Sequence, residues 1–180
     1  MHAAAFDFLR LGLAGCLLLF VLAECVRAGA PKGWGGLAAR LDGFLGNFVD
    51  GRDGGSVIIS HLSLLVGMGV PVWLEGSGAS FASLSGYLTL GLMDVFAVVF
   101  GRAFGRHPLY RDSKKTVEGT LGGFAAAAAA CALLAAARPV PLAPVCAALA
   151  VVAVLEASTS QLDNLFMPVQ LYALLKAVGV

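Results

Sequence analysis

The sequence predicts an all-α, polytopic transmembrane bundle of about six helices, and three observations lead to this fold class. Of the 180 residues, 59% are hydrophobic and only 13% are charged, whereas an average soluble domain has roughly 25% charged residues. The mean hydropathy is +0.87. The apolar residues also gather in stretches that are close to the length of about 20 residues with which a helix crosses a bilayer.

These apolar stretches follow one another along the chain with polar connections between them. They cover about residues 6–26, 57–74, 81–100, 121–137, 140–155 and 165–180. A short Glu-Gly-Ser-Gly turn separates the second from the third, which predicts an antiparallel hairpin, and residues 27–56 form a polar, Gly-rich connection. The first stretch has a second interpretation, because with Ala28-Gly29-Ala30 it resembles a cleavable secretory signal. Glu24 argues against that alternative, since it interrupts the apolar run.

The distribution of charge predicts how the bundle lies in the membrane. The net charge is only +1, so the overall balance indicates no nucleic-acid partner. If the spans alternate, one side of the membrane receives nine of the twelve basic residues: Arg27, Lys32, Arg40, Arg52, Arg102, Arg106, Arg111, Lys114 and Lys115. Cytoplasmic loops carry an excess of Lys and Arg, so this side is predicted to be cytosolic. The acids that it also receives include Asp50, Asp53, Glu118 and Asp163.

The segment from Asp94 to Thr120 contains the strongest functional pattern. It leaves an apolar span through Gly101-x-x-x-Gly105, and it holds five of the basic residues before apolar sequence resumes at Leu121. Its end, Ser113-Lys-Lys-Thr-Val-Glu-Gly-Thr120, lies at a loop-to-helix junction, where backbone N–H groups and the helix dipole favour a phosphate. We therefore predict a site for a di- or triphosphate at the membrane surface. The alternative is a capped helix with basic anchors, with the two glycines serving helix packing.

Acidic residues near the ends of the spans are candidates for metal binding or for acid–base chemistry. Asp94 lies in an apolar span, where a charge is costly and usually functional, and a carboxylate there suits Mg²⁺; alternatively it is a helix-end residue close to water. Glu156 and Asp163 are about two helical turns apart, or form a polar turn. The segment 50–55 is equally a turn or a site. No spacing of Cys and His indicates a zinc site or a disulfide framework.

Phosphoryl transfer fits this set of residues, because it depends mainly on positioning, on cations and on metal-held phosphates. A base near the acceptor hydroxyl would complete such a site. The Walker motif and the His-Arg-Asp set of protein kinases do not occur in the sequence, which disfavours the common ATP-binding folds.

Several motifs together closely resemble the C-terminal part of the dolichol kinases, within the CTP-dependent polyprenol and lipid kinase group. They are Phe48-Val-Asp-Gly-Arg-Asp-Gly54, Ile59-Ser-His-Leu62, Pro71-Val-Trp-Leu74, Asp94 with Gly101-Arg-x-x-Gly105, Lys114-Lys-Thr-Val-Glu-Gly-Thr120, and Glu156 with Asp163-Asn-Leu165 and Pro168. The resemblance covers about Leu41 to Pro168. The Lys-Lys-Thr-x-Glu-Gly-Thr element is its most specific part.

The resemblance implies transfer of the γ-phosphate of CTP, with Mg²⁺ or another divalent cation, to dolichol, a polyprenol lipid. It places this activity at the endoplasmic reticulum membrane, in the service of protein glycosylation. It implies a membrane helix and the start of a cytosolic loop over residues 1–40, and a lipid kinase domain over 41–180. The nucleotide-binding candidates are Gly101, Arg102, Gly105, Ser113, Lys114, Lys115, Thr116, Glu118, Gly119 and Thr120; the catalytic ones are Asp94, Lys115, Glu118 and Asp163, of which Asp94 and Asp163 are the metal ligands.

Departures from the family pattern keep other interpretations open. Met93 stands where the family usually has Gly, Gly51 stands where it has an acid, and dolichol kinases are usually much longer. The alternatives are a CTP-dependent kinase for phytol, farnesol or diacylglycerol, and a catalytically inactive membrane scaffold or fragment. The loop chemistry does not distinguish cytidine from adenosine, so the expectation of CTP follows from the resemblance.

Overall fold

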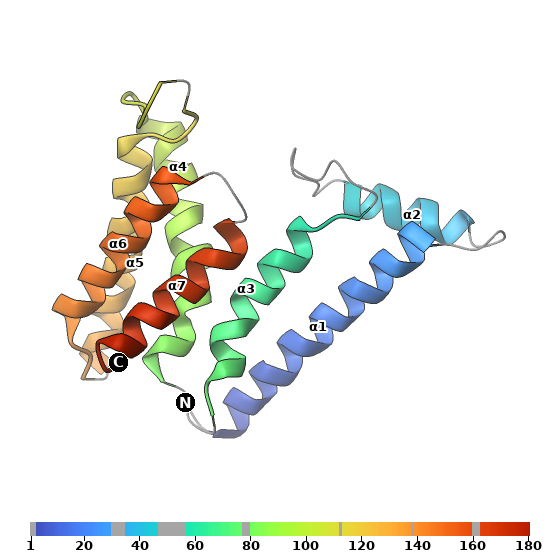
Figure 1. Ribbon diagram of the computed structural model, residues 1–180, viewed down its shortest axis with the longest axis horizontal. Coiled ribbons are helices and arrows are strands. Elements are labelled where there is room, and N and C mark those ends of the chain that lie inside the picture. The colour runs from blue at the N-terminus through green and yellow to red at the C-terminus, as the bar shows by residue number, and fades with distance from the viewer. Residues whose placement is uncertain are drawn as a thin grey trace.

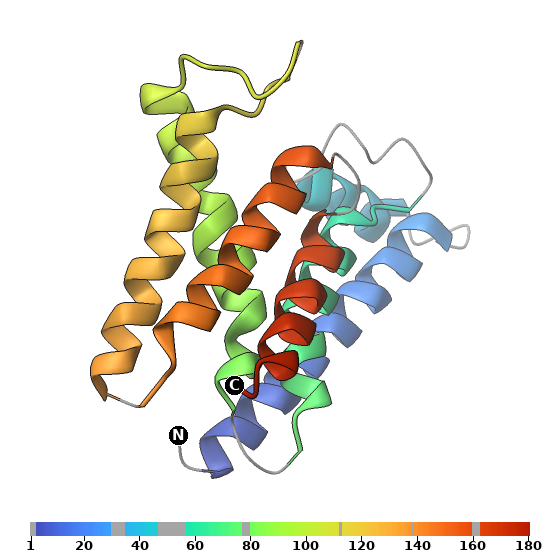
Figure 2. The same cartoon turned by 60° about the vertical axis from the view of Figure 1, so that its left-hand side comes forward.

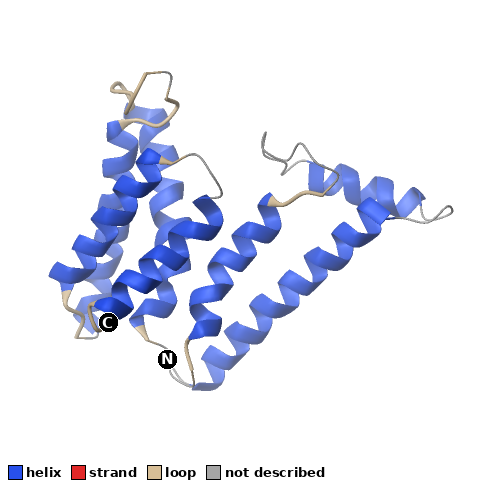
Figure 3. Cartoon of the chain, viewed as in Figure 1, coloured by secondary structure: helices blue, strands red, loops and turns tan. Residues whose placement is uncertain are grey.

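The computed structural model describes residues 3–29, 35–46, 57–76, 80–111, 113–137, 139–159 and 163–180. Over these ranges the chain is almost wholly helical (Figure 3), and they contain no strand beyond an isolated bridge between Pro108 and Thr116. The elements are α1 (Ala3–Gly29), α2 (Gly35–Leu45), α3 (Ser60–Leu74), η2 (Phe81–Leu84), η3 (Tyr87–Asp94), α4 (Val95–Phe104), α5 (Val117–Ala137), α6 (Leu142–Ser158) and α7 (Asp163–Ala177). The all-α prediction is confirmed.

The long helices run alternately up and down the bundle (Figures 1 and 2). The C-terminal ends of α1, α4 and α6 and the N-terminal ends of α3, α5 and α7 lie together, at the upper end of Figure 1. Each of the six apolar stretches forms helical structure. Within the residues that the structure describes, three helices are long and apolar enough to cross a membrane: Ala4–Gly29, Tyr87–Phe104 and Val117–Ala137. The apolar helices α3 and α6 are shorter. This is the architecture of a multi-pass membrane protein.

One helix lies in the segment that the sequence indicated to be a polar connection. In α2, apolar residues recur at Leu37, Leu41, Phe44 and Leu45, which is the spacing of a helix face. The abundance of glycine around this short run hid the pattern. Residues 27–56 are therefore not connection throughout, and α2 packs against α1.

Helix α5 packs against both α4 and η3, and small residues allow the close approach. A Cβ atom added at Gly119 would lie 2.7 Å from the carbonyl oxygen of Ala97, and one at Gly123 would collide with the carbonyl oxygen of Met93. Such an approach is open only to glycine. The contact sets the first turn of α5 beside Gly101, and it supports the packing interpretation of the glycine spacing.

The core lies where η3, α5, α6 and α7 meet. Its fully buried members include Met93, Cys131, Leu149 and Leu171. These side chains come from segments up to 78 residues apart in sequence, and each element brings its apolar face to a shared centre. The core thus fixes η3 and α6 against α5 below the upper end of the bundle.

A buried acid joins α1 to α3 at the same upper end. Glu24 is only 6% exposed, and its carboxylate accepts a hydrogen bond from the N–H of Ile58 at 2.6 Å and pairs with Arg27 at 2.6 Å. Arg27 also binds Asp42 on α2 at 3.0 Å. The glutamate that interrupts the first apolar run therefore has a structural partner in the segment just before α3, and α1 packs against α3.

Candidate functional site

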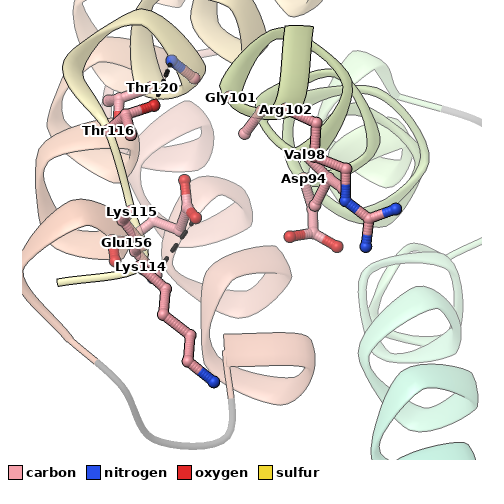
Figure 4. Close-up of a pocket in the computed structure, with 11 residues that line it drawn as sticks. Asp94, Val98, Gly101, Arg102, Lys114, Lys115, Thr116, Thr120 and Glu156 are labelled. Atoms are coloured by element: carbon pink, nitrogen blue, oxygen red, sulfur yellow. Dashed lines mark hydrogen bonds and ion pairs between the residues drawn. The ribbon is translucent and has the colours of Figure 1, made fainter. Parts of the chain in front are cut away.

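A pocket of about 390 Å³ lies at the upper end of the bundle, where α4, the start of α5 and the end of α6 meet the loop before α5 (Figure 4). The residues that line it are Asp94, Ala97, Val98, Gly101, Arg102, Lys114, Lys115, Thr116, Gly119, Thr120 and Glu156. Its lining combines three basic side chains, two acids and two hydroxyls on an otherwise apolar wall. Such convergent polar groups in a concave site are typical of ligand-binding pockets.

The α4 wall of this pocket begins at the end of a π-helix. Tyr87–Asp94 has π-helical geometry and continues directly into α4. Such segments are rare and are often found at functional sites. Asp94 is the last π-helical residue, and Arg102 follows on the same wall eight residues later, which is about 12 Å along an α-helix.

The basic wall comes from a hairpin-like loop, residues 105–116. Its two arms are joined by the hydrogen bonds Leu109 N–H to Lys115 C=O (3.1 Å) and Val117 N–H to His107 C=O (2.9 Å). The Ser113 hydroxyl accepts a hydrogen bond from the N–H of Lys115 at 3.0 Å. These bonds hold Lys114 and Lys115 against the pocket. Within the described part of the chain, neither Lys114 nor Arg102 has an ion-pair partner, so both cations are available to an anion.

Residues of the preceding loop accept hydrogen bonds from the backbone N–H groups in the first turn of α5. Thr116 Oγ1 accepts from the N–H of Gly119 at 3.2 Å, the Thr116 carbonyl accepts from the N–H of Thr120 at 3.0 Å, and Val117 donates to His107. The sequence led us to expect these N–H groups to hold a phosphate, but they are largely used within the protein. The helix dipole and the neighbouring cations therefore supply most of the attraction for an anion.

The side chain of Lys115 binds the end of α6, whereas that of Lys114 has no ion-pair partner among the described residues. Its Nζ donates to the carbonyl oxygens of Glu156 and Thr159, the latter at 3.0 Å, and lies 3.4 Å from the Glu156 carboxylate. The Glu156 side chain is only 7% exposed. A lysine caps the last carbonyls of a helix favourably, so Lys115 ties the loop to the C-terminus of α6.

Glu118 lies outside the pocket and faces the loop. Its carboxylate contacts His107, with 2.6 Å between Glu118 Oε1 and His107 Nδ1, and accepts from the His107 N–H at 3.3 Å. This pairing orders the start of the loop. The geometry thus separates Glu118 from Asp94, although the sequence grouped both as candidates for catalysis.

The structure therefore brings together most, but not all, of the predicted site. Eight predicted residues line the pocket: Asp94, Gly101, Arg102, Lys114, Lys115, Thr116, Gly119 and Thr120. Gly105 and Ser113 shape the loop from outside the pocket. Asp163 begins α7, but its side chain and the segment 50–55 lie outside the described residues.

The sequence indicated Glu156 as an acid at the end of a span without including it among the site residues, and it did not indicate Ala97 or Val98; all three line the pocket. For Glu156 a signal was present, since an acid ended an apolar span, but its distance from Lys115 in sequence hid the pairing. Among the described residues there is no group of three or more His, Cys, Asp or Glu that could hold a metal ion by itself. The two pocket carboxylates, Asp94 and Glu156, are nevertheless oxygen ligands of the kind that Mg²⁺ combines with substrate phosphates.

Fold and pocket define a multi-pass helical membrane protein with a basic, carboxylate-bearing pocket at one end of its bundle. The model of the cytidylyltransferase family matches residues 56–169, which include every pocket residue. The chain belongs to this family. No solved structure matches it.

Curated relatives with sequence similarity are named as dolichol kinases. Dolichol kinase EVAN of Arabidopsis thaliana is 35% identical over 183 residues, which cover 93% of this chain and 31% of the relative. The human dolichol kinase is 35% identical over 90% of this chain and 32% of its own length. Dolichol kinase sec59 of Schizosaccharomyces pombe is 31% identical over 95% of this chain and 35% of its own length. The chain thus spans about a third of the length of these relatives.

Proposed function

We propose that this chain carries the phosphate-transfer site of a dolichol kinase, which moves the γ-phosphate of CTP to the hydroxyl of dolichol and yields dolichyl phosphate and CDP. The observation that carries the proposal is the pocket, where Arg102 and Lys114 lie toward the loop and Asp94 lies deeper, within a membrane helix. The names of the relatives support the choice of donor class and acceptor.

The acid Asp94 and the base Arg102 lie at different depths along the helix, and we assign each substrate to one of these positions. The phosphates of CTP bind Arg102 and Lys114 near the loop, beside the Thr116 and Thr120 hydroxyls. The dolichol hydroxyl approaches from the bilayer toward Asp94, about 12 Å deeper along the helix. A carboxylate in reach of that hydroxyl serves as the proton acceptor or as a metal ligand. Lys115 acts by positioning the loop, because its ammonium group is already engaged at the end of α6.

A divalent cation fits the donor set of this pocket. Asp94 and Asp163 are the proposed ligands, and Glu156 adds a second carboxylate to the pocket lining. When bound, Mg²⁺ would neutralise charge on the transferred phosphoryl group. The site would work at the endoplasmic reticulum membrane with the loop 105–116 on the cytosolic side, where basic loops accumulate.

The test is transfer of label from CTP by the purified 180-residue chain in detergent, with Mg²⁺ and dolichol. With CTP labelled at the γ position, we expect labelled dolichyl phosphate, and Asp94→Asn should remove it. ATP, phytol, farnesol and diacylglycerol tested in parallel identify the donor and the acceptor. Absence of transfer by the folded chain would favour an inactive scaffold or fragment instead.

A second candidate is transfer of the cytidylyl group, which the name of the matched family favours. The same pocket would then hold CTP, but the α-phosphate would move to the acceptor and pyrophosphate would be released. CTP labelled at the α position distinguishes the two reactions, because its label stays in CDP in the kinase reaction and enters the lipid in the other. Labelled lipid from α-labelled CTP alone would overturn the kinase proposal.

A further inference from the structure

A second pocket, of about 440 Å³, lies on the other side of the loop 105–116. It is lined by Leu109, Tyr110, Thr120, Val154, Ala157 and Ser158, so its walls are the first arm of the loop, the start of α5 and the end of α6. Thr120 also lines the pocket that holds Arg102 and Lys114. The two pockets therefore share the side chain of Thr120, and Lys115, which lines the first pocket, binds the end of α6.

We infer that this second pocket receives the cytosine and ribose of the nucleotide, an inference that rests on the proposed use of CTP. The triphosphate lies in the first pocket, and the ribose passes Thr120. A volume of about 440 Å³ falls within the range of roughly 300–1,000 Å³ that is usual for small-molecule sites.

The aromatic ring of Tyr110 provides the surface on which the base stacks. Its side chain is 51% exposed, and its backbone position is fixed because the Tyr110 carbonyl accepts a hydrogen bond from the N–H of Ser113 at 3.0 Å. A half-exposed aromatic ring on an ordered turn is a ready platform for a nucleobase. Leu109 and Val154 supply apolar contacts on the same pocket.

The end of α6 supplies the polar groups that favour cytosine. The last carbonyls of a helix lack partners within the helix, and Ala157 and Ser158 belong to this last turn. The Ser158 hydroxyl donates to the Val154 carbonyl at 2.7 Å, which leaves its lone pairs as acceptors. The exocyclic amine of cytosine is a donor, whereas uracil has a carbonyl there, so this wall should select CTP over UTP.

Binding of labelled CTP to the full 180-residue chain in detergent tests the inference separately from catalysis. Tyr110→Leu should weaken CTP binding about tenfold, while Tyr110→Phe should retain most of the affinity because the ring remains. Inorganic tripolyphosphate, measured by competition, should bind both variants as it binds the unchanged chain. Ser158→Ala should lower the preference for CTP over UTP without weakening tripolyphosphate.

The possible results separate the failure of this inference from the failure of the proposed function. If the unchanged chain binds no CTP, the proposed function itself fails. Unchanged CTP affinity in Tyr110→Leu would overturn the base site alone. An equal loss of CTP and tripolyphosphate would show that Tyr110 only shapes the loop. A raised KM for dolichol with unchanged CTP affinity would assign the pocket to the lipid and would equally overturn the inference.

Discussion

Two adjacent lysines of the loop have different surroundings, although their sequence context suggested one role. Lys114 is exposed and lines the pocket. Lys115 is partly buried and binds two carbonyls and the carboxylate at the end of α6. A cation in the open can bind an anion at little cost, whereas one already paired must first give up its partners.

Substitution of each lysine by alanine should therefore affect different quantities. Lys114→Ala is expected to raise the KM for CTP and to leave the thermal unfolding temperature in detergent nearly unchanged. Lys115→Ala should destabilise the protein by about 1–3 kcal/mol, because it removes the ammonium group that pairs with the buried Glu156 carboxylate and donates to the carbonyls at the end of α6. Equal effects of the two changes on stability would contradict this division.

Two acids that the sequence grouped together also lie in different places. Asp94 lines the pocket, whereas Glu118 faces His107 across the loop. Asp94→Asn is expected to lower kcat by a factor of about 100 or more, as removal of a group in contact with the reacting atoms does. Glu118→Gln should retain most of kcat, because an amide still accepts from the His107 N–H. A larger loss in Glu118→Gln than in Asp94→Asn would reverse the assignment.

At the scale of the elements, the positions of the long helices were predictable from the sequence, but the π-helical geometry and some contacts between the helices were not. Long apolar runs define α1 and α5 without reference to the rest of the chain, because a helix that spans a membrane is specified locally. Helix η3 packs against α5 and α7, and no local pattern in the sequence predicted its π-helical geometry. The Lys115–Glu156 pair joins residues 41 positions apart, so no local pattern announced it.

The close packing at the glycines of α5 leads to a prediction about stability and CTP binding. Gly119→Ala would place a Cβ atom 2.7 Å from the Ala97 carbonyl oxygen, and overpacking of this kind costs about 1–3 kcal/mol. We expect a lower unfolding temperature and weaker CTP binding, because α4 must move away from the start of α5. The matched control is Gly12→Ala in α1, where an added Cβ meets nothing within 4 Å. Comparable destabilisation by both changes would argue against close packing as the reason for Gly119.

At the scale of the whole molecule, alternation of the helices collects the pocket, the loop 105–116 and the Glu24 network at one end. Alternation of the predicted spans decided which connections share a side, and the count of basic residues predicted that this side is cytosolic. The network around Glu24 and the short helix α2 escaped prediction, since both depend on contacts between segments rather than on local pattern.

The orientation of this end in the membrane is a further prediction. Arg106 is exposed in the loop 105–116. Pro139 is exposed between α5 and α6, whose adjoining ends lie at the opposite end of the bundle (Figure 1). In sealed microsomes with the native cysteines replaced, Arg106→Cys should react with an impermeant maleimide added from outside, which is the cytosolic side. Pro139→Cys should react only after the membrane is opened. The reverse pattern would place the pocket in the lumen.

The π-helical segment Tyr87–Asp94 makes the geometry of the pocket depend on the number of residues that precede α4. A π-helical turn contains more residues than an α-helical turn, so Tyr87–Asp94 shifts the angular phase between the core residue Leu88 and the α4 wall. Loss of one residue within this segment would let it relax to an α-helix while every pocket residue kept its identity. The carboxylate of Asp94 would then rotate relative to the core, so a one-residue deletion here should be as damaging as loss of the acid itself.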